Sequence, residues 1–239
     1  MSIPRLFVEA TLEEGLVVEA APGQAHHIGT VLRRGPGDAV RLFNPRDGEW
    51  AATIESIRKD RARFTLGGQT RPPAAEKAVR LLVAALKRDA MDWVVEKAAE
   101  LGATLIQPVL TQRSVADRAN VARLSAIARG AAEQCERLAV PVVAEAAPLH
   151  RVLDAWDELP LVVAMERSLA APPRVLGLPA GQPLALLVGP EGGFTGPELD
   201  DLRRRPFVVP AALGPRILRA ETAAVAGLAA LQALWGDWA

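Results

Sequence analysis

The stretch 79-VRLLVAAL-86 indicates which kind of domain this chain forms. It is apolar except for Arg80, which is typical of a parallel strand buried on both faces. Asp89 is the expected N-cap of a helix that Gly102 ends, and Thr104–Leu110 is a second predicted strand. Apolar residues recur at helical spacing between these signals, at Met91, Val94, Val95, Ala98 and Leu101. The order of strand, helix and strand predicts an α/β domain with a largely parallel sheet.

The same alternation continues toward the C-terminus. Strands are predicted over Leu161–Met165, Leu184–Val188 and Phe207–Val209, and helices over Asn120–Leu138, Pro197–Arg205 and Glu221–Trp235. From Ala223 to Trp235 only Gln232 is polar, so the last helix must be buried on all sides. It is either internal to the domain or packed against a second subunit, and a subunit contact would make the protein a homodimer.

The first part of the chain has a different pattern, with short strands around one helix. The strands are predicted over Arg5–Glu9, Leu16–Ala20, Ala39–Phe43, Ala51–Ile57 and Ala62–Leu66, and the helix over Gln24–Arg34. Gly67–Lys77 contains adjacent prolines and no periodicity, so we expect the linker there. We place a small domain at residues 1–71, the linker at 72–78 and the α/β domain at 79–239.

Composition excludes several classes of function. The chain has 239 residues with 28 basic and 28 acidic side chains, so it does not coat nucleic acid by bulk charge. Its one cysteine and three histidines form no metal-ligand pattern, so no metal is expected. Phosphate-loop, dinucleotide and serine-hydrolase motifs are absent from the sequence. No stretch is apolar enough to span a membrane, and we expect a cytoplasmic protein.

Two segments that follow predicted strands could carry chemistry. The first, 189-GPEGGFTG-196, has four glycines that let the backbone approach a ligand, although it is also consistent with a tight turn. The second, 213-LGPRILRAET-222, places two arginines and a glutamate before the last helix. Glu221 could simply complement the helix dipole, but that reading gives no reason for Arg216 and Arg219.

These two segments carry a family resemblance. VGPEGGFTGPEL, residues 188–199, and LGPRILRAETA, residues 213–223, closely resemble the paired signatures of the RsmE family in the SPOUT superfamily of methyltransferases. Residues 86–115 resemble the family's first α/β unit, AAEQCER at 131–137 its long helix, and residues 26–44 its N-terminal domain. The resemblance covers nearly the whole chain, in order.

The resemblance implies a fold and an activity. It implies an N-terminal PUA-like small β-barrel and a C-terminal SPOUT α/β domain with a deep trefoil knot. Family members are homodimers that transfer a methyl group from S-adenosyl-L-methionine to N3 of a uridine in 16S ribosomal RNA, free or in the small ribosomal subunit. The cofactor would lie in loops Met165–Ser168, Gly189–Gly193 and Leu213–Leu218. The cofactor-binding residues are then Met165, Glu166, Gly189, Pro190, Glu191, Gly192, Gly193, Leu213, Gly214, Arg216, Ile217 and Leu218.

The chemistry suggests roles for three charged residues. Uracil N3 must lose its proton, and the resulting negative charge spreads onto the neighbouring carbonyl oxygens. We assign Arg219 to stabilising that charge and Glu221 to accepting the proton or orienting the base, with Glu191 as the alternative base. Basic residues on both domains are the expected RNA contacts, namely Arg5, His26, Arg33, Arg34, Lys87, Arg88, Arg113 and Arg137.

The chain departs from the family pattern in two places. Glu136 stands where members usually carry a small residue, often glycine, and a carboxylate there would repel phosphate. The run Ala220–Ala223 keeps the glutamate and Thr222 but has alanines where the family carries two further hydroxyls, so the flanking hydroxyls receive no catalytic role. Two other functions stay open: a non-catalytic RNA-binding protein, and an enzyme that methylates a ribose 2′-hydroxyl or transfer RNA.

Overall fold

Strand β6 (Val79–Ala84) lies inside a parallel sheet, as its apolar sequence predicts. The computed structural model describes residues 3–59, 61–157, 159–165, 178 and 182–238. Over these residues the strand order is β12-β10-β11-β6-β7-β8, and β9 also pairs with β7. The other strands are β7 (Ala103–Leu110), β8 (Val142–Val143), β9 (Ala147–Pro148), β10 (Leu161–Ala164), β11 (Leu184–Val188) and β12 (Val208–Ala211). Each pairing is parallel, which confirms the predicted sheet.

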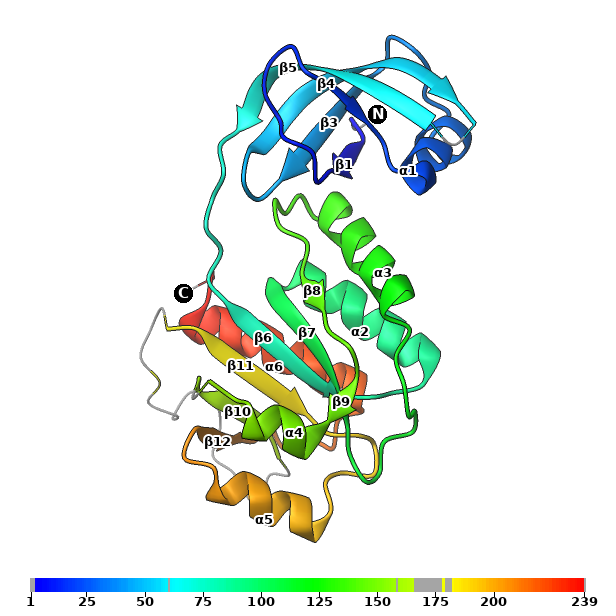
Figure 1. Ribbon diagram of the computed structural model, residues 1–239. Helices are drawn as coiled ribbons and strands as arrows, with labels where there is room; N and C mark the ends of the chain where they lie inside the picture. The colour runs from blue at the N-terminus through cyan, green and yellow to red at the C-terminus, as the bar shows by residue number, and fades with distance from the viewer. Residues whose placement is uncertain (1–2, 60, 158, 166–177, 179–181, 239) are drawn as a thin grey trace. The chain divides into compact units, whose positions relative to one another are not determined.

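Helices cover both faces of this sheet (Figure 1). On one face, α4 (Leu149–Asp154) and α5 (Gly196–Arg204) contribute Leu149, Leu153 and Leu202 to a buried cluster with strand residues such as Leu82. On the other face lie α2 (Arg88–Glu100) and α6 (Ala220–Trp235). The parallel sheet is therefore the middle layer of three.

Two helix ends differ from the predicted positions. The N-cap of α2 is Lys87 and not Asp89. Asp89 lies in the first turn, where its carboxylate interacts favourably with the helix dipole. Gly102 ends the helix as predicted, with a φ of +83°. Helix α3 (Val121–Gln134) stops before the predicted Leu138. The backbone turns at Glu136, which has a φ of +63°.

Helix α6 is buried on one side only. Ala224, Leu228 and Leu231 are buried, whereas Ala233 is exposed and Leu234 is 39% exposed. The alternative of a fully internal helix is therefore wrong for the described chain. The apolar outer side is left for a second subunit or for solvent.

The chain forms two compact units. One comprises Met1–Ala75 and Ala132–Val140, and the other Glu76–Ala131 and Pro141–Ala239. The predicted linker, residues 72–78, contains neither helix nor strand, and the units divide within it. The prediction places residues 132–140 in the α/β domain, whereas the structure groups them with the N-terminal unit.

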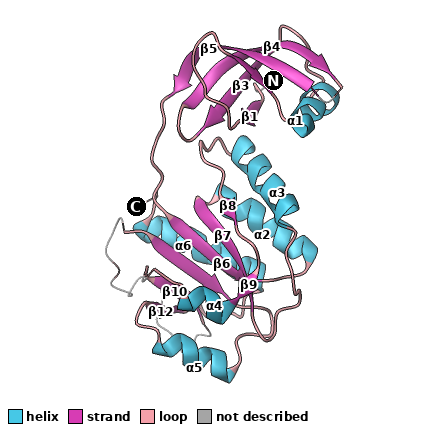
Figure 2. Cartoon of the chain, in the orientation of Figure 1, coloured by secondary structure: helices cyan, strands magenta, loops and turns pink. Residues whose placement is uncertain are grey.

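The N-terminal unit is built on a second sheet, of order β1-β3-β4-β5-β2 (Figure 2). Its strands are β1 (Arg5–Phe7), β2 (Val17–Glu19), β3 (Ala39–Asn44), β4 (Gly48–Arg58) and β5 (Arg61–Arg71). Register shifts along β4 and β5 are the irregularities that bend a hairpin into a small barrel. The core includes Leu42, Ile54 and Phe64, all essentially inaccessible to solvent.

Two predictions for this unit need correction. Residues 67–71 belong to β5 and not to a linker, because the strand continues past the two adjacent glycines and pairs again with β4 at Gln69 and Arg71. The single helix over Gln24–Arg34 is instead a short helix α1 (Pro22–His26) followed by a π-helical turn, η1 (His27–Val31). Arg33, with a φ of +52°, lies beyond both.

Candidate functional site

Three loops leave neighbouring strands at the same edge of the parallel sheet. Val163 of β10 is paired with Leu187 of β11 on one side and with Pro210 of β12 on the other. Just beyond β10, the Met165 N–H donates to the carbonyl of Ala211, at 2.9 Å. The carboxyl ends of parallel strands are where open α/β sheets bind ligands. The structure therefore brings the starts of all three predicted cofactor loops together.

The glycine-rich loop after β11 is a tight turn. The Gly193 N–H donates to the Pro190 carbonyl at 2.8 Å, and Gly193 has a φ of +67°. A Cβ on Gly189 would lie 3.0 Å from the ring of Phe194, so the loop folds back over that ring. Glu191 and Gly192 are exposed at the tip. The segment therefore forms a tight turn and also leaves its tip exposed, so a tight turn is compatible with close approach of the backbone to a ligand.

The loop after β12 is open to solvent and contains an exposed apolar side chain. Gly214 has a φ of +117°, and Gly214, Pro215 and Arg216 are exposed. Ile217 is 96% exposed, the highest value among the exposed large apolar residues described. Leu213 and Leu218, at either end, are half-buried. In the first loop Met165 is half-buried, whereas the predicted Glu166 lies outside the described residues.

The three proposed catalytic residues lie on the second and third of these loops. Arg219 is the N-cap residue of α6 and is exposed, and Glu221 lies in the first turn of that helix and is half-buried. Glu191 is exposed on the glycine-rich loop. A carboxylate at a helix N-terminus is stabilised by the helix dipole. Arg219 and Glu221 therefore stand where the third loop enters α6.

Arg5 does not have the exposed position expected of an RNA contact. Its side chain is 5% exposed, and its Nε lies 2.6 Å from Glu49 Oε2. The other guanidinium nitrogens donate to the carbonyls of Ala132, Glu133 and Arg137 at 3.0–3.1 Å. This placement gives Arg5 a structural part within the N-terminal unit, so we remove it from the RNA contacts.

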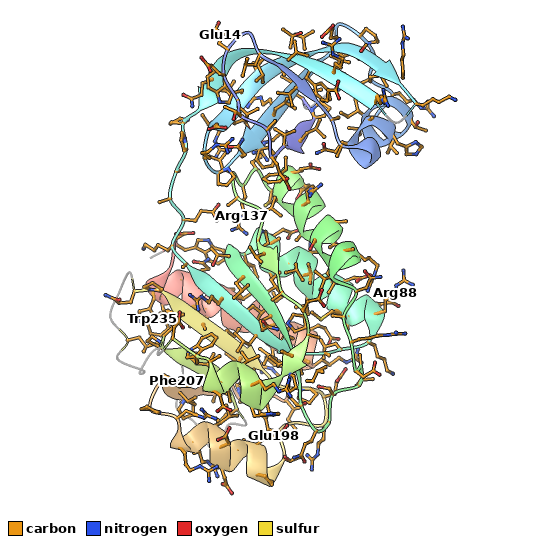
Figure 3. The ribbon with its side chains drawn as sticks, viewed as in Figure 1. Glu14, Arg88, Arg137, Glu198, Phe207 and Trp235 are labelled. Atoms are coloured by element: carbon orange, nitrogen blue, oxygen red, sulfur yellow. The ribbon has the colours of Figure 1, made fainter. Side chains whose placement is uncertain are left out.

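The remaining predicted RNA contacts divide by exposure. His26 and Arg33 of the N-terminal unit are exposed, as are Lys87 and Arg88 at the start of α2. Figure 3 labels Arg88 there and Arg137 beyond the end of α3. Arg34 and Arg137 are half-buried. The four exposed side chains are accessible to a phosphate backbone. The assignment of all six residues to RNA binding stays a prediction.

Arg113 is exposed but bound to the glycine-rich loop. Its Nη1 donates to the Gly192 carbonyl at 2.7 Å, and its side-chain carbons lie beside the Gly192 Cα. The preceding Gln112 N–H donates to Glu198 Oε1 at 2.8 Å. Sequence reasoning missed this arrangement, since nothing in either segment indicates that the two loops touch.

Sequence reasoning also missed a basic hairpin tip in the N-terminal unit. Arg58, Lys59, Arg61 and Arg63 are all exposed, and Arg58 is paired directly opposite Arg61. Among the described residues of this hairpin, Arg63 lies 3.4 Å from the carboxylate of Glu55. Like charges directly opposite one another destabilise a sheet, so this pair favours an anionic partner. The signal in the sequence is the run 58-RKDRAR-63.

Neither a candidate metal site nor a membrane-spanning helix is found among the described residues. No group of three or more histidine, cysteine or acidic residues with metal-site geometry occurs among them. Within that same part of the chain, no helix is both long and apolar enough to cross a bilayer.

Comparison with known proteins identifies the family. A family model described as an RNA methyltransferase domain matches residues 73–232, and one described as an RNA methyltransferase PUA domain matches residues 22–67. Ribosomal RNA small subunit methyltransferase E of Rickettsia conorii is 33% identical over 236 residues, covering 98% of this chain and 97% of the relative. The chain belongs to the ribosomal RNA small subunit methyltransferase E family. The RsmE protein of Bacillus subtilis is 31% identical, with 95% of both chains covered.

Solved structures agree with this membership. The RsmE crystal structure from Neisseria gonorrhoeae, bound to S-adenosyl methionine, has a TM-score of 0.90 and 30% identity and covers both chains fully. A Legionella pneumophila methyltransferase in complex with the same cofactor has a TM-score of 0.88 and 28% identity, covering 99% of this chain and all of that one. The predicted RsmE family and its α/β fold with a PUA domain are confirmed. The trefoil knot stays a prediction, because residues 166–177 and 179–181 lie outside the described chain.

Proposed function

We propose that this RsmE protein transfers the methyl group of S-adenosyl-L-methionine to N3 of a uridine in 16S ribosomal RNA. The observation that carries the proposal is the meeting of three loops at the ends of β10, β11 and β12, in a chain that aligns over its full length with a cofactor-bound RsmE structure. The glycine-rich loop and the exposed Ile217 fit such a cofactor. Glycines let backbone groups approach the edge of an adenine ring, and an apolar side chain can pack against its face. When bound, the cofactor supplies an electrophilic methyl group on a sulfonium.

The chain's own residues orient and deprotonate the target base. Glu221 takes the N3 proton or orients the base, and Arg219 donates hydrogen bonds to the uracil oxygen on which negative charge develops. Their places at the entrance to α6 support these roles, since both lie beside the third loop. Glu191 is the alternative base. Positioning of the base against the methyl group contributes much of the rate, because the two reactants then no longer need to meet by diffusion.

RNA is bound by a few basic side chains at defined positions, and not by a high net positive charge of the protein. Residues 1–71 contain ten basic and nine acidic side chains, so the N-terminal unit is nearly neutral. The proposed contacts on that unit are His26, Arg33, Arg34 and Arg137, and on the other unit Lys87 and Arg88.

We propose a homodimer in which the partly exposed side of α6, including Leu234, meets a second copy. Light scattering tests the dimer, and a monomer would contradict it.

The deciding experiment is methyl transfer in vitro. The protein is incubated with S-adenosyl-L-methionine and either 16S RNA or small subunits that lack the modification, and the RNA is mapped by mass spectrometry. A single methylated uridine N3 is expected. Methyl on a ribose or on no nucleotide would overturn the proposal, as would methyl transfer to transfer RNA supplied in a parallel reaction in place of 16S RNA. In single-turnover assays at saturating cofactor, Arg219→Ala and Glu221→Gln should each lower the rate by about 100-fold. Glu191→Gln should leave the rate near that of the wild type. A loss in Glu191→Gln with none in Glu221→Gln would assign the base role to Glu191.

A further inference from the structure

We infer that Arg113 and Glu198 act together as positioning residues that hold the loop Gly189–Gly193 in its cofactor-binding conformation. The inference rests on the proposed function, which assigns that loop to S-adenosyl-L-methionine. It also replaces the RNA role that the sequence suggested for Arg113. The two residues are joined through the turn Thr111–Ser114, which follows β7.

The turn Thr111–Ser114 is closed by its own side chains. The Thr111 N–H donates to Ser114 Oγ at 2.9 Å, and the Ser114 N–H donates to the Thr111 carbonyl at 3.2 Å. The two hydroxyl oxygens lie 3.0 Å apart, within hydrogen-bond distance. Because local bonds fix the turn, Gln112 and Arg113 at its tip are presented in one direction.

Both tip residues bind the segment that follows β11. Arg113 Nη1 donates to the Gly192 carbonyl at 2.7 Å, and a Cβ added to Gly192 would lie 3.3 Å from Arg113 Cδ. The Gln112 N–H donates to Glu198 Oε1 at 2.8 Å. Two neighbouring residues of one turn thus reach the two ends of the segment 192–198. In Figure 3 the labelled Glu198 lies on α5, the helix that this segment enters.

Glu198 connects this turn to the start of α5. Its Oε2 accepts from the Thr195 N–H at 2.8 Å and from Thr195 Oγ1 at 2.9 Å, while Oε1 accepts from Gln112. One carboxylate therefore caps α5 and binds the turn at the same time. A glutamine has only one acceptor oxygen, so it could serve Thr195 or Gln112 fully, but not both.

The consequence for the loop is a fixed peptide plane at its tip. The carbonyl of Gly192 is bound by Arg113, and the N–H of Gly193 is bound by the Pro190 carbonyl at 2.8 Å. Paired glycines have the largest conformational freedom of any residues, so an unrestrained loop would lose that freedom when the cofactor binds. Fixing the loop beforehand removes this cost and tightens binding.

The test measures cofactor binding and RNA binding separately. Isothermal calorimetry gives the Kd of S-adenosyl-L-methionine for the wild type and for Arg113→Ala, Glu198→Gln and the double variant. Arg151→Ala is the matched control, since Arg151 is an exposed arginine of α4 in the same unit. RNA affinity is measured by filter binding without cofactor, and steady-state kinetics give KM for the cofactor and kcat.

Each single variant should raise the cofactor Kd and KM about tenfold, with kcat at saturating cofactor and RNA affinity within twofold of the wild type. The double variant should also be about tenfold weaker, and not a hundredfold, because both changes release the same loop. Arg113→Lys should recover part of the affinity, since an ammonium can still donate to one carbonyl. Arg151→Ala should bind as the wild type does.

Other outcomes overturn the inference. A cofactor Kd unchanged in Arg113→Ala, including a case in which only the melting temperature falls, would mean that the contact does not act on the loop. Reduced RNA affinity with normal cofactor binding would return Arg113 to the RNA contacts. A hundredfold loss in the double variant would mean two separate effects. A wild-type protein that binds no cofactor would refute the proposed function itself, and this inference with it.

Discussion

Arg5 and Glu49 form a buried ion pair in the N-terminal unit, with Arg5 Nε 2.6 Å from Glu49 Oε2 and the side chains only 5% and 1% exposed. Glu49 also accepts from Arg41 at 2.8 Å and from the Thr70 hydroxyl at 2.9 Å. Arg5 in turn donates to carbonyls at the end of α3, and its guanidinium stacks 4.2 Å from the centre of the Phe43 ring. One carboxylate therefore organises β1, β3 and β5 and, through Arg5, residues 132–137.

This pair should make the N-terminal unit sensitive to acid. Burial raises the pKa of Glu49, but hydrogen bonds from Arg5, Thr70 and Arg41 outweigh burial and hold the pKa below its ordinary value. A lowered folded-state pKa stabilises the protein above the unfolded pKa, and this stabilisation is lost as pH falls from about 5 toward 3. Glu49→Gln should cost about 3 kcal/mol at pH 7 and flatten this acid dependence. Urea midpoints measured between pH 7 and pH 3 test it, and equal acid slopes in both proteins would contradict it.

Replacing Glu136 by glycine should stabilise the protein. Glu136 follows α3 with a φ of +63°, a left-handed conformation that costs a residue with a Cβ about 1 kcal/mol relative to glycine. The backbone carbonyl that accepts from Arg71 at 2.7 Å would be kept. Glu136→Gly should therefore gain about 1 kcal/mol in urea unfolding, whereas Glu136→Ala, which keeps the Cβ, should gain nothing. Equal stability of the two variants would show that backbone strain is not the cause.

The contact of α6 with the parallel sheet depends on a missing side chain. A Cβ on Gly227 would lie 2.6 Å from Leu186 Cδ2, so Gly227→Ala must displace either the buried Leu186 side chain or the helix. After allowing for the better helix propensity of alanine, the change should cost about 1–2 kcal/mol.

The matched control for that change is Gly130→Ala in α3. No atom lies within 4 Å of a Cβ placed on Gly130. The same substitution should therefore raise stability there, by up to about 1 kcal/mol. Melting temperatures of the two variants, compared with the wild type, should shift in opposite directions. A loss of stability in both would remove the steric explanation at Gly227.

The hairpin tip should contribute to RNA binding through charge alone. Arg58 and Arg61 are exposed and directly opposite one another. Arg58→Ala with Arg61→Ala should reduce the slope of log affinity against log salt by about 1.4 to 1.8, because each phosphate contact contributes about 0.7 to 0.9. Cofactor affinity should not change. An unchanged salt slope for RNA, measured beside Arg151→Ala, would show that the tip does not meet phosphate.

Strand and helix positions in the α/β unit could be predicted because local rules and tertiary structure agree there. Val79–Leu86 is apolar on both faces, and β6 is buried on both faces; Gly102 has the positive φ that a helix stop requires. The same rules failed at Gly67–Arg71. Two glycines and a threonine read as a loop, yet Gln69 and Arg71 pair with Trp50 and Glu49 of β4, so the strand continues past them. Pairing with a partner strand is invisible to local propensity.

The loops of the site could be located, but not what holds them. The glycines at 189–193 and the arginines at 216 and 219 are visible in the sequence as unusual patterns. An arginine that binds phosphate and one that binds a buried carboxylate or a carbonyl look alike in a sequence. The sequence assigns both Arg5 and Arg113 to RNA for that reason. Burial against Glu49 corrects the assignment of Arg5, and the bond to Gly192 is the basis of the positioning role proposed for Arg113.

The strand order also determines when the α/β unit can assemble during synthesis. Strand β10 lies between β11 and β12, and both of these partners are made after it. Helix α6, which covers β11 at Leu186, is made after every strand of the sheet. A nascent chain that lacks α6 therefore exposes the apolar part of the sheet face, around β11 and β6, that α2 does not cover. Folding should be slow for the size of the unit, and premature termination should yield chains that aggregate instead of smaller folded domains.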